Sequence, residues 1–185
     1  DGAKGEPYTE DDEPNPLNVY GQTKLAGEQA VQAVGGAYLI FRTSWVYSLR
    51  RPCFVTKVLQ WAREQETLRI VDDQISTPTW ARTLAEATGQ IIAQGIGEPV
   101  GFILANCGLY HLTDGGSCSR YEWAKKVLSF QDISTIRVET AKSREFKSPA
   151  KRPNFSALDC ALVQKQFDLD LPEWTLSQRH CLQNS

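Results

Sequence analysis

Residues 18–28 read Asn-Val-Tyr-Gly-Gln-Thr-Lys-Leu-Ala-Gly-Glu and come just after Pro14 and Pro16, which stop any helix before them, so they predict the start of a helix. Tyr20 and Lys24 are four residues apart in this stretch, which places their side chains on one helix face. A fixed ammonium beside a phenol favours the phenolate, and such a pair can give a proton to a carbonyl oxygen or take one from an alcohol. Tyr–Lys pairs with this spacing also occur by chance on helix surfaces, so the rest of the chain has to decide between the two interpretations.

Outward from this stretch, the sequence alternates predicted helices with predicted strands. Gly35 and Gly36 end the first helix, and the apolar run Tyr-Leu-Ile-Phe after them predicts a buried strand within residues 37–45. Further strands are predicted at 68–71, 109–113 and 136–140, and further helices at 54–66, 79–94, 121–130, 157–166 and 174–182. Ser119 and Glu122 have the spacing of a capping box before the helix at 121–130. The alternation predicts an α/β fold with parallel strands.

The composition of the 185 residues is ordinary for a globular protein, with 41% hydrophobic and 23% charged residues. A formal net charge of -2 argues against a nucleic-acid partner, and no apolar run reaches the roughly 18 residues of a membrane span. The five cysteines lack metal-ligand spacing, which predicts free, buried thiols in a reducing cytoplasm. His111 lies in an apolar run and is predicted to be a hydrogen-bonded structural residue rather than a zinc ligand.

Several segments resemble one enzyme family. They are Val-Tyr-Gly-Gln-Thr-Lys-Leu-Ala-Gly-Glu (19–28), Phe-Arg-Thr-Ser-Trp-Val-Tyr (41–47), Val-Asp-Asp-Gln-Ile-Ser-Thr-Pro-Thr (71–79), Gly-Leu-Tyr-His-Leu-Thr (108–113), Ser-Arg-Tyr-Glu-Trp-Ala (119–124), Lys-Arg-Pro-Asn-Phe-Ser-Ala-Leu-Asp (151–159) and Leu-Pro-Glu-Trp (171–174). Each is weak alone, but together, in this order, they are similar to the extended short-chain dehydrogenase/reductases that act on nucleotide sugars. Within that family they are most similar to the reductases of dTDP-4-keto-6-deoxy sugars.

The resemblance implies a partial Rossmann-type, doubly wound parallel sheet with a smaller α/β substrate-binding lobe. Residues 1–45 and 76–116 correspond to the cofactor domain, and residues 46–75 and 117–185 to the lobe. The chain begins with Asp1 and contains no methionine, which predicts that it is part of a longer protein. The family's N-terminal half, with its Gly-rich turn and its catalytic Ser/Thr, is then expected outside this chain.

The resemblance also implies the roles of four residues around the cofactor, NADPH or NADH. Tyr20 is expected to protonate the C4 ketone oxygen of the sugar while a nicotinamide delivers hydride, and Lys24 to steady the tyrosinate and bind the nicotinamide ribose. Thr43 and Ser44 are expected to line the nicotinamide side. The preference between NADH and NADPH stays open, as does a divalent metal such as Mg²⁺.

Three further residues are expected to bind the dTDP-sugar. Trp45 corresponds to a tryptophan that packs against the sugar, with a core aromatic as the alternative. Arg152 fits an arginine on the substrate diphosphate, because its fork matches phosphate oxygens, with a solvated surface charge as the alternative. Gln74 is expected to contact either the nucleotide or a second subunit. Cys53 stands where related enzymes often have asparagine, which leaves the sugar specificity open.

Other functions remain as alternatives. Another extended family member, an epimerase or a dehydratase, uses the same Tyr–Lys pair, and a non-catalytic regulatory homologue keeps the fold alone. A homodimer is also left open. The chain by itself is expected to lack reductase activity, to bind dTDP-sugar poorly and nicotinamide cofactor not measurably, and to associate through an exposed sheet edge.

Overall fold

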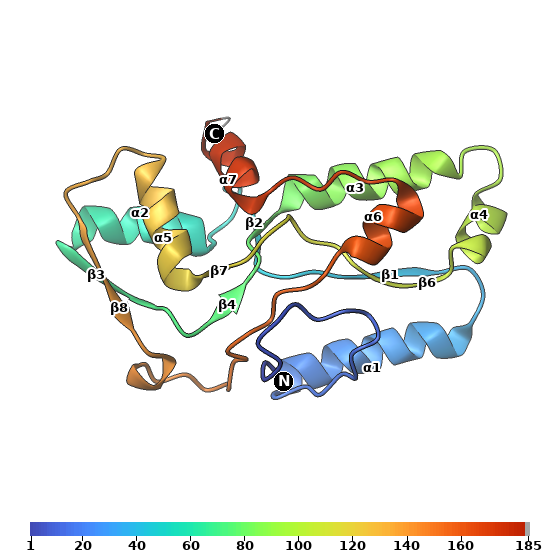
Figure 1. The fold of residues 1–185 in the computed structure, drawn as a ribbon, viewed down its shortest axis with the longest axis horizontal. Coiled ribbons are helices and arrows are strands. Elements are labelled where there is room, and N and C mark those ends of the chain that lie inside the picture. The colour runs from blue at the N-terminus through green and yellow to red at the C-terminus, as the bar shows by residue number, and fades with distance from the viewer. Residues whose placement is uncertain (184–185) are drawn as a thin grey trace.

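The structure, a computed structural model, describes residues 1–183 and shows helices and short strands along one long axis (Figure 1). The helices are Val19–Val34 (α1), Phe54–Glu64 (α2), Ala81–Gln94 (α3), Pro99–Ala105 (α4), Arg120–Ser129 (α5), Ala161–Phe167 (α6) and Trp174–Gln183 (α7), with a 3-10 turn at Ser143–Glu145. The strands are Leu39–Arg42 (β1), Val46–Tyr47 (β2), Thr67–Val71 (β3), Ile75–Ser76 (β4), Thr79–Trp80 (β5), Gly108–His111 (β6), Cys118–Ser119 (β7) and Arg137–Ala141 (β8).

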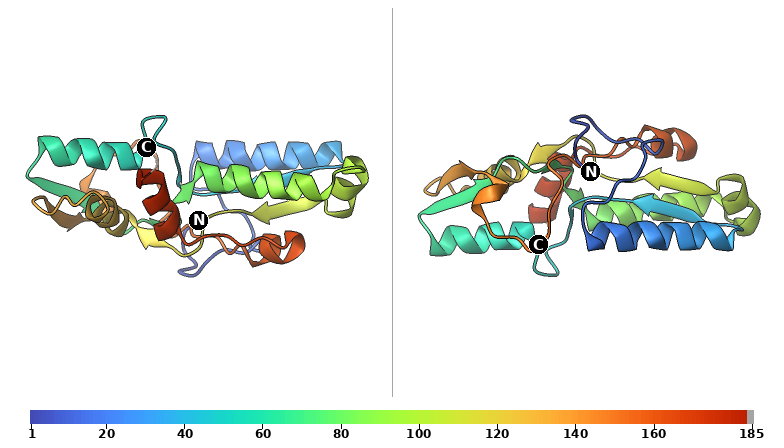
Figure 2. Two further views of the ribbon diagram at one scale, coloured as in Figure 1. Left: turned by 90° about the horizontal axis from the view of Figure 1, so that it is seen from above. Right: turned by 90° about the horizontal axis from the view of Figure 1, so that it is seen from below.

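Three of the four strand pairs are parallel. β1 pairs with β6, β2 with β5 and β3 with β8, whereas the short pair of β4 and β7 is antiparallel. In the β1–β6 pair, Leu39 lies opposite Gly108 and Arg42 opposite His111. Helices cover both faces of this pair: α1 and α3 lie on one side and α6 on the other (Figure 2). The predicted α/β fold with parallel strands is therefore confirmed.

Two hydrophobic cores divide the molecule. The first is built mainly from α2, α5, β3 and α7, around Val55, Val58, Leu68 and the fully buried Trp123. The second lies between β1, β6, α3 and α6, and includes Ile91, Tyr110, Val163 and Phe167. α6, which lies within residues 117–185, thus packs in the core of the β1–β6 pair. The division of the chain into a cofactor domain and a substrate lobe stays a prediction.

Local sequence explains how the main helices begin and end. The side chain of Asn18 accepts a hydrogen bond from the backbone of Gly21 and so caps α1, and Gly35 takes a left-handed φ of 72° that ends it. At α5, the predicted capping box is confirmed, because Ser119 accepts from Glu122 N while the Glu122 carboxylate accepts from Ser119 N. These contacts fix the first turn of α5, and with it the direction of the residues that follow Ser119.

The helices differ from the sequence prediction at several points, and the two-residue strands β2, β4, β5 and β7 were not predicted, with β5 at residues 79–80 where a helix was expected. α4 was not predicted, although Pro99 stands at its first position and the Glu98 side chain accepts from Gly101 N at 3.1 Å. The helix predicted at 157–166 begins only at Ala161. Residues 157–159 are held extended instead, because Tyr8 donates its N–H to the Ala157 carbonyl and accepts one from Asp159. Long-range pairing here overrides the local helical pattern.

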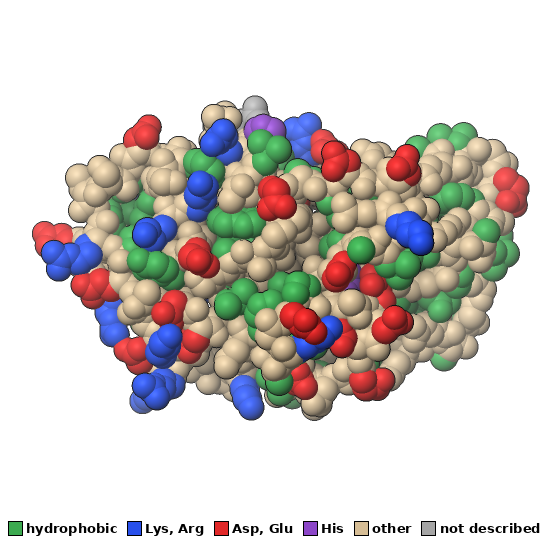
Figure 3. Space-filling model, viewed as in Figure 1, with side chains coloured by type: hydrophobic (Ala, Val, Ile, Leu, Met, Phe, Trp, Pro, Cys, Tyr) green, Lys and Arg blue, Asp and Glu red, His purple; other side chains and the backbone are tan. Residues whose placement is uncertain are grey.

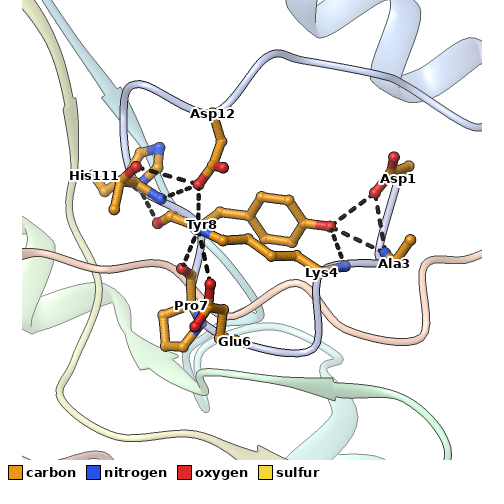
Figure 4. Close-up of polar contacts among 9 residues, drawn as sticks. Asp1, Ala3, Lys4, Glu6, Pro7, Tyr8, Asp12 and His111 are labelled. Atoms are coloured by element: carbon orange, nitrogen blue, oxygen red, sulfur yellow. Dashed lines mark hydrogen bonds and ion pairs between the residues drawn. The ribbon is translucent and has the colours of Figure 1, made fainter.

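The N-terminal segment is ordered by contacts around Tyr8 (Figure 4). Its hydroxyl donates to the Asp1 carboxylate at 2.8 Å, and Lys4 forms an ion pair with Asp12 at 2.7 Å. The backbone carbonyl of Tyr8 lies 3.0 Å from Nδ1 of His111, which is buried. His111 is therefore the hydrogen-bonded structural histidine that the sequence predicts.

Within residues 1–183 no disulfide forms, in agreement with the predicted free thiols. Cys118 and Cys181 are buried as predicted, but Cys53 and Cys160 are only partly buried and Cys107 is exposed. No helix in this part of the chain is both long and apolar enough to cross a membrane.

A buried carboxyl group makes the stability depend on pH. Asp114 accepts a hydrogen bond from Trp80 N at 3.1 Å and lies near Thr83 of α3 and Ser177 of α7. Burial raises the pKa of Asp114 to about 6. A carboxyl group with a raised pKa in the folded state stabilises the fold fully below its unfolded pKa, and this contribution is lost as the pH rises through the folded pKa.

We therefore expect Asp114→Asn, which keeps an acceptor for Trp80 N, to remove the contribution of Asp114 to the pH dependence, a loss of about 2 kcal/mol of stability between pH 4 and pH 7. Urea unfolding of both proteins at the two pH values measures this difference. Carboxylates with lowered pKa values, such as Asp73, are common to both proteins and cancel in the comparison. A variant with the same pH dependence as the native protein would contradict the expectation.

Candidate functional site

The first turns of α1 carry the Tyr–Lys pair. Nζ of Lys24 lies 5.5 Å from the centroid of the Tyr20 ring, and Tyr20 is 72% exposed, so the predicted shared face is confirmed and open to solvent. α1 begins at the end of the β1–β6 pair where both strands end (Figure 1). Ligands of parallel α/β sheets bind at this carboxyl edge.

Residues 43–45 follow β1 at the same edge. Thr43 is exposed, and the Ser44 hydroxyl donates to the Thr77 carbonyl at 2.8 Å. Trp45 has a positive φ of 39°, a conformation that is unfavourable for a bulky residue and persists only where its surroundings impose it. Its ring stacks on Trp123 with centroids 5.5 Å apart, at an interplanar angle of 9°. Trp45 is thus anchored on the core while staying partly exposed.

A cleft of about 380 Å³ lies at the surface of the first core. None of residues 43–45 lines it, but the guanidinium of Arg120, which does, lies 3.8 Å from the centroid of the Trp45 ring. It is lined by Cys53, Phe54, Lys57, Trp61, Arg69, Ile70, Val71, Gln74, Arg120, Phe146 and Arg152. A neighbouring hollow of about 590 Å³ shares Val71, Gln74, Phe146 and Arg152 with the cleft. The structure therefore brings Gln74 and Arg152, which the sequence singled out separately, to one site with Cys53.

The cleft is basic. Four of its lining side chains are cationic, and of these Arg69 pairs with Glu145. Arg120 and Arg152 form no ion pair within residues 1–183. On the face drawn in Figure 3, most Lys and Arg side chains lie on the left half, where Asp and Glu side chains are interspersed with them. The positive excess is therefore a property of the cleft lining, which within residues 1–183 contains no Asp or Glu. An anionic ligand fits this charge distribution.

Gln74 is held in place by its neighbours. Its Nε2 donates to the Ser143 hydroxyl at 2.8 Å, and that hydroxyl donates to the Asp73 carboxylate at 2.7 Å. The Gln74 carbonyl accepts the backbone N–H of Arg120 at 3.2 Å, next to the β4–β7 pair. The choice between a nucleotide contact and a subunit contact for Gln74 stays a prediction.

Asn18 connects the Tyr–Lys helix to the loop of Arg152. Its Oδ1 accepts from Gly21 N at 2.9 Å, while its Nδ2 donates to the Lys151 carbonyl at 2.8 Å. One side chain therefore both caps α1 and holds the residue before Arg152. The two residues in this contact are 133 positions apart in the sequence, and no local pattern predicts it.

Sequence reasoning missed Arg120, Lys57 and the aromatic walls of the cleft. Arg120 follows the N-cap Ser119, so the sequence alone presents it as a first-turn residue on a helix surface. Only the pairing of β7 with β4 turns it toward Gln74.

Cys53 is the N-cap of α2, where its backbone N–H donates to the Thr56 hydroxyl at 2.8 Å. Residues 1–183 contain no cluster of three or more His, Cys, Asp or Glu side chains that could hold a metal ion.

Comparisons with known proteins agree with this geometry. The dTDP-4-dehydrorhamnose reductase of Burkholderia thailandensis is 33% identical over 191 residues, covering 100% of this chain and 64% of that protein. The crystal structure of a dTDP-4-dehydrorhamnose reductase, an RfbD ortholog from Clostridium acetobutylicum, has a TM-score of 0.88 at 33% identity and covers 100% of this chain and 61% of its own. That of a dTDP-4-dehydrorhamnose reductase from Bacillus anthracis, in complex with NADP, has a TM-score of 0.87 at 30% identity, with 100% and 61% coverage.

The chain thus spans about three fifths of the length of these relatives. The family description "RmlD substrate binding domain" matches residues 1–185. The resemblance found in the sequence is confirmed: the chain belongs to the RmlD substrate binding domain family.

Proposed function

We propose that this chain works as part of an NADPH-dependent reductase that converts the C4 ketone of dTDP-4-dehydrorhamnose to the alcohol of dTDP-rhamnose. The observation that carries the proposal is the exposed Tyr20–Lys24 pair on α1, which Asn18 joins to the loop of Arg152 at a basic cleft. The names of the relatives support the substrate, and the NADP complex of the Bacillus anthracis enzyme supports the cofactor.

Tyr20 donates the proton. Negative charge builds on the ketone oxygen during reduction, so a proton donor must reach that atom. The exposed Tyr20 hydroxyl meets this need, and the ammonium of Lys24 on the same face stabilises the tyrosinate that remains. When bound, the nicotinamide cofactor supplies the hydride.

The residues at the end of β1 fit the nicotinamide end of the cofactor. Lys24 has an exposed ammonium that can donate to ribose hydroxyls, and Thr43 has an exposed hydroxyl. The Ser44 proton is engaged by the Thr77 carbonyl, so Ser44 offers its hydroxyl oxygen as an acceptor. We propose Tyr20, Lys24, Thr43 and Ser44 as the residues of this chain that contact the cofactor.

The substrate lies between Trp45 and the cleft in this proposal. The partly exposed ring of Trp45 packs against the sugar, Arg152 binds the diphosphate, and Gln74 contacts the nucleotide. The dTDP-sugar is then the partner of the site. A homodimer and a cytoplasmic location stay predictions of the sequence, as does the absence of a nucleic-acid partner.

An assay of the intact protein containing this chain tests the function. With dTDP-4-dehydrorhamnose and NADPH, we expect loss of NADPH absorbance and formation of dTDP-rhamnose in equal amounts. An epimerase or dehydratase converts its nucleotide sugar without net consumption of NADPH, and a regulatory homologue shows no turnover. Either result would overturn the proposal.

A cofactor titration of the 185-residue chain tests where the cofactor is held. We expect no saturable binding of NADPH, because the Gly-rich turn that holds the pyrophosphate in such enzymes is not in this sequence. Saturable binding at micromolar concentrations would show that residues 1–185 hold most of the cofactor site.

Arg152→Ala is expected to weaken dTDP binding to the intact protein by roughly 1.5–3 kcal/mol, the contribution of a hydrogen bond to a charged group. The loss should appear mainly in KM, because the diphosphate is bound alike before and during the reaction. Calorimetric titration with dTDP measures it. Arg137→Ala, at an exposed arginine beside Glu139, is the control and should leave the affinity unchanged. Unchanged affinity in Arg152→Ala would place Arg152 on the solvated surface.

A further inference from the structure

Arg120 is packed against aromatic rings at the edge of the cleft. Its guanidinium carbon lies 3.8 Å from the ring centroid of Trp45, 4.8 Å from that of Phe54 and 5.2 Å from that of Trp123. Its backbone is fixed as well, by the hydrogen bond to Gln74 and by the capping box of α5. The side chain is thus held in one place by stacking, without a carboxylate partner.

The charge of Arg120 is uncompensated. Burial lowers the pKa of the Arg120 guanidinium to about 10, and the positive charge of Arg152 adds to the effect. Both arginines line the same cleft, together with Lys57, and neither guanidinium has an ion pair within residues 1–183. Two like charges in a partly desolvated cleft destabilise each other, whereas an anion between them removes this cost.

The shape of the cleft indicates which anion it takes. About 380 Å³ is within the usual range for a small-molecule site, and Phe54, Trp61 and Phe146 give it apolar walls that can accept a nucleobase. Arginine forks bind paired phosphate oxygens, and two forks match a diphosphate better than a single phosphate. The same Arg120 side chain also contacts Trp45, which we place against the sugar.

We propose that Arg120 is a second diphosphate-binding residue, which binds the substrate diphosphate together with Arg152 and is oriented by stacking on Trp45. This inference rests on the proposed function, because it takes the nucleotide sugar as the ligand of the cleft. It gives Arg120 a binding role that Lys could not fill equally well, since Lys has neither the fork nor the flat stacking surface.

The test is a calorimetric titration of the intact protein and its variants with dTDP, with thymidine, which lacks the diphosphate, and with NADP⁺, which carries a different one. Arg120→Met should lower the affinity for dTDP roughly tenfold to a hundredfold and leave thymidine and NADP⁺ unchanged. Arg120→Lys, which keeps the charge and the stem, should lose less. Arg82→Ala is the matched control, because Arg82 also lies over a tryptophan, 5.5 Å from the Trp80 ring, but pairs with Glu86 outside the cleft.

The outcomes separate this inference from the proposed function. If Arg152→Ala weakens dTDP binding while Arg120→Met and Arg120→Lys bind it as the native protein does, Arg120 has no binding role and the proposed function stands. If Arg120→Met weakens NADP⁺ rather than dTDP, Arg120 serves the cofactor and the inference is overturned. If the native protein does not bind dTDP at all, both the role of Arg120 and the proposed function are overturned. If Arg120→Met does not fold, Arg120→Lys replaces it in the test. A lower affinity for dTDP in Arg120→Lys than in Arg82→Ala supports the inference, and equal affinities overturn it.

Discussion

Tyr20→Phe in the intact protein is expected to lower kcat for dTDP-4-dehydrorhamnose by roughly 10²–10⁴-fold, the usual contribution of a general acid. Phenylalanine keeps the aromatic ring that lies 5.5 Å from Nζ of Lys24 but cannot donate a proton. Affinity for the substrate should change little. Steady-state kinetics with NADPH measure both quantities, and turnover close to that of the native protein would remove Tyr20 from the mechanism.

The chain offers a matched control for this variant. Tyr121 and Lys125 on α5 form a second Tyr–Lys pair with the same spacing, and Nζ of Lys125 lies 5.4 Å from the Tyr121 ring, against 5.5 Å in the Tyr20–Lys24 pair. Tyr121→Phe should leave kcat unchanged, because α5 packs in the first core and does not begin at the carboxyl edge of the β1–β6 pair. A similar loss of kcat in both variants would point to a general effect of removing a tyrosine hydroxyl.

Trp123→Ala is expected to lower the free energy of unfolding by roughly 3–5 kcal/mol, as for other large aromatic residues in a core. Trp123 is 1% exposed, and its ring contacts Trp45, Tyr47 and Phe54. Its indole N–H also donates to Oε1 of Gln178, which is fully buried, so the variant leaves both a cavity and an unpaired buried acceptor. Urea unfolding monitored by circular dichroism measures the loss.

Trp123→Phe separates the two parts of this effect. It keeps a six-membered aromatic ring in the core but removes the N–H and the rest of the indole, so a smaller loss of roughly 1–3 kcal/mol is expected from the unpaired Gln178 and a smaller cavity. A loss as large as that of Trp123→Ala would contradict the expectation that the remaining aromatic ring supports the core. In either variant the stacking surface of Trp45 changes, and dTDP binding should weaken with it.

The sequence by itself determined the features that depend on neighbouring residues. The alternation of helices and strands, the capping box of Ser119 and Glu122, and the shared face of Tyr20 and Lys24 all follow from spacing along a few turns. Hydrogen bonds and side-chain directions within one helix are set by its own geometry, so a local pattern is enough to predict them.

The tertiary structure alone decided how these parts meet. The two-residue strands β2, β4, β5 and β7 exist only as pairs between distant segments, and no periodicity can appear in two residues. Residues 157–159 are extended rather than helical because Tyr8 pairs with them. Arg120 faces the cleft because β7 lies on β4, and Asn18 reaches the Arg152 loop across 133 positions. Such contacts depend on the packing of the whole chain, since the local sequence at either end is compatible with many partners.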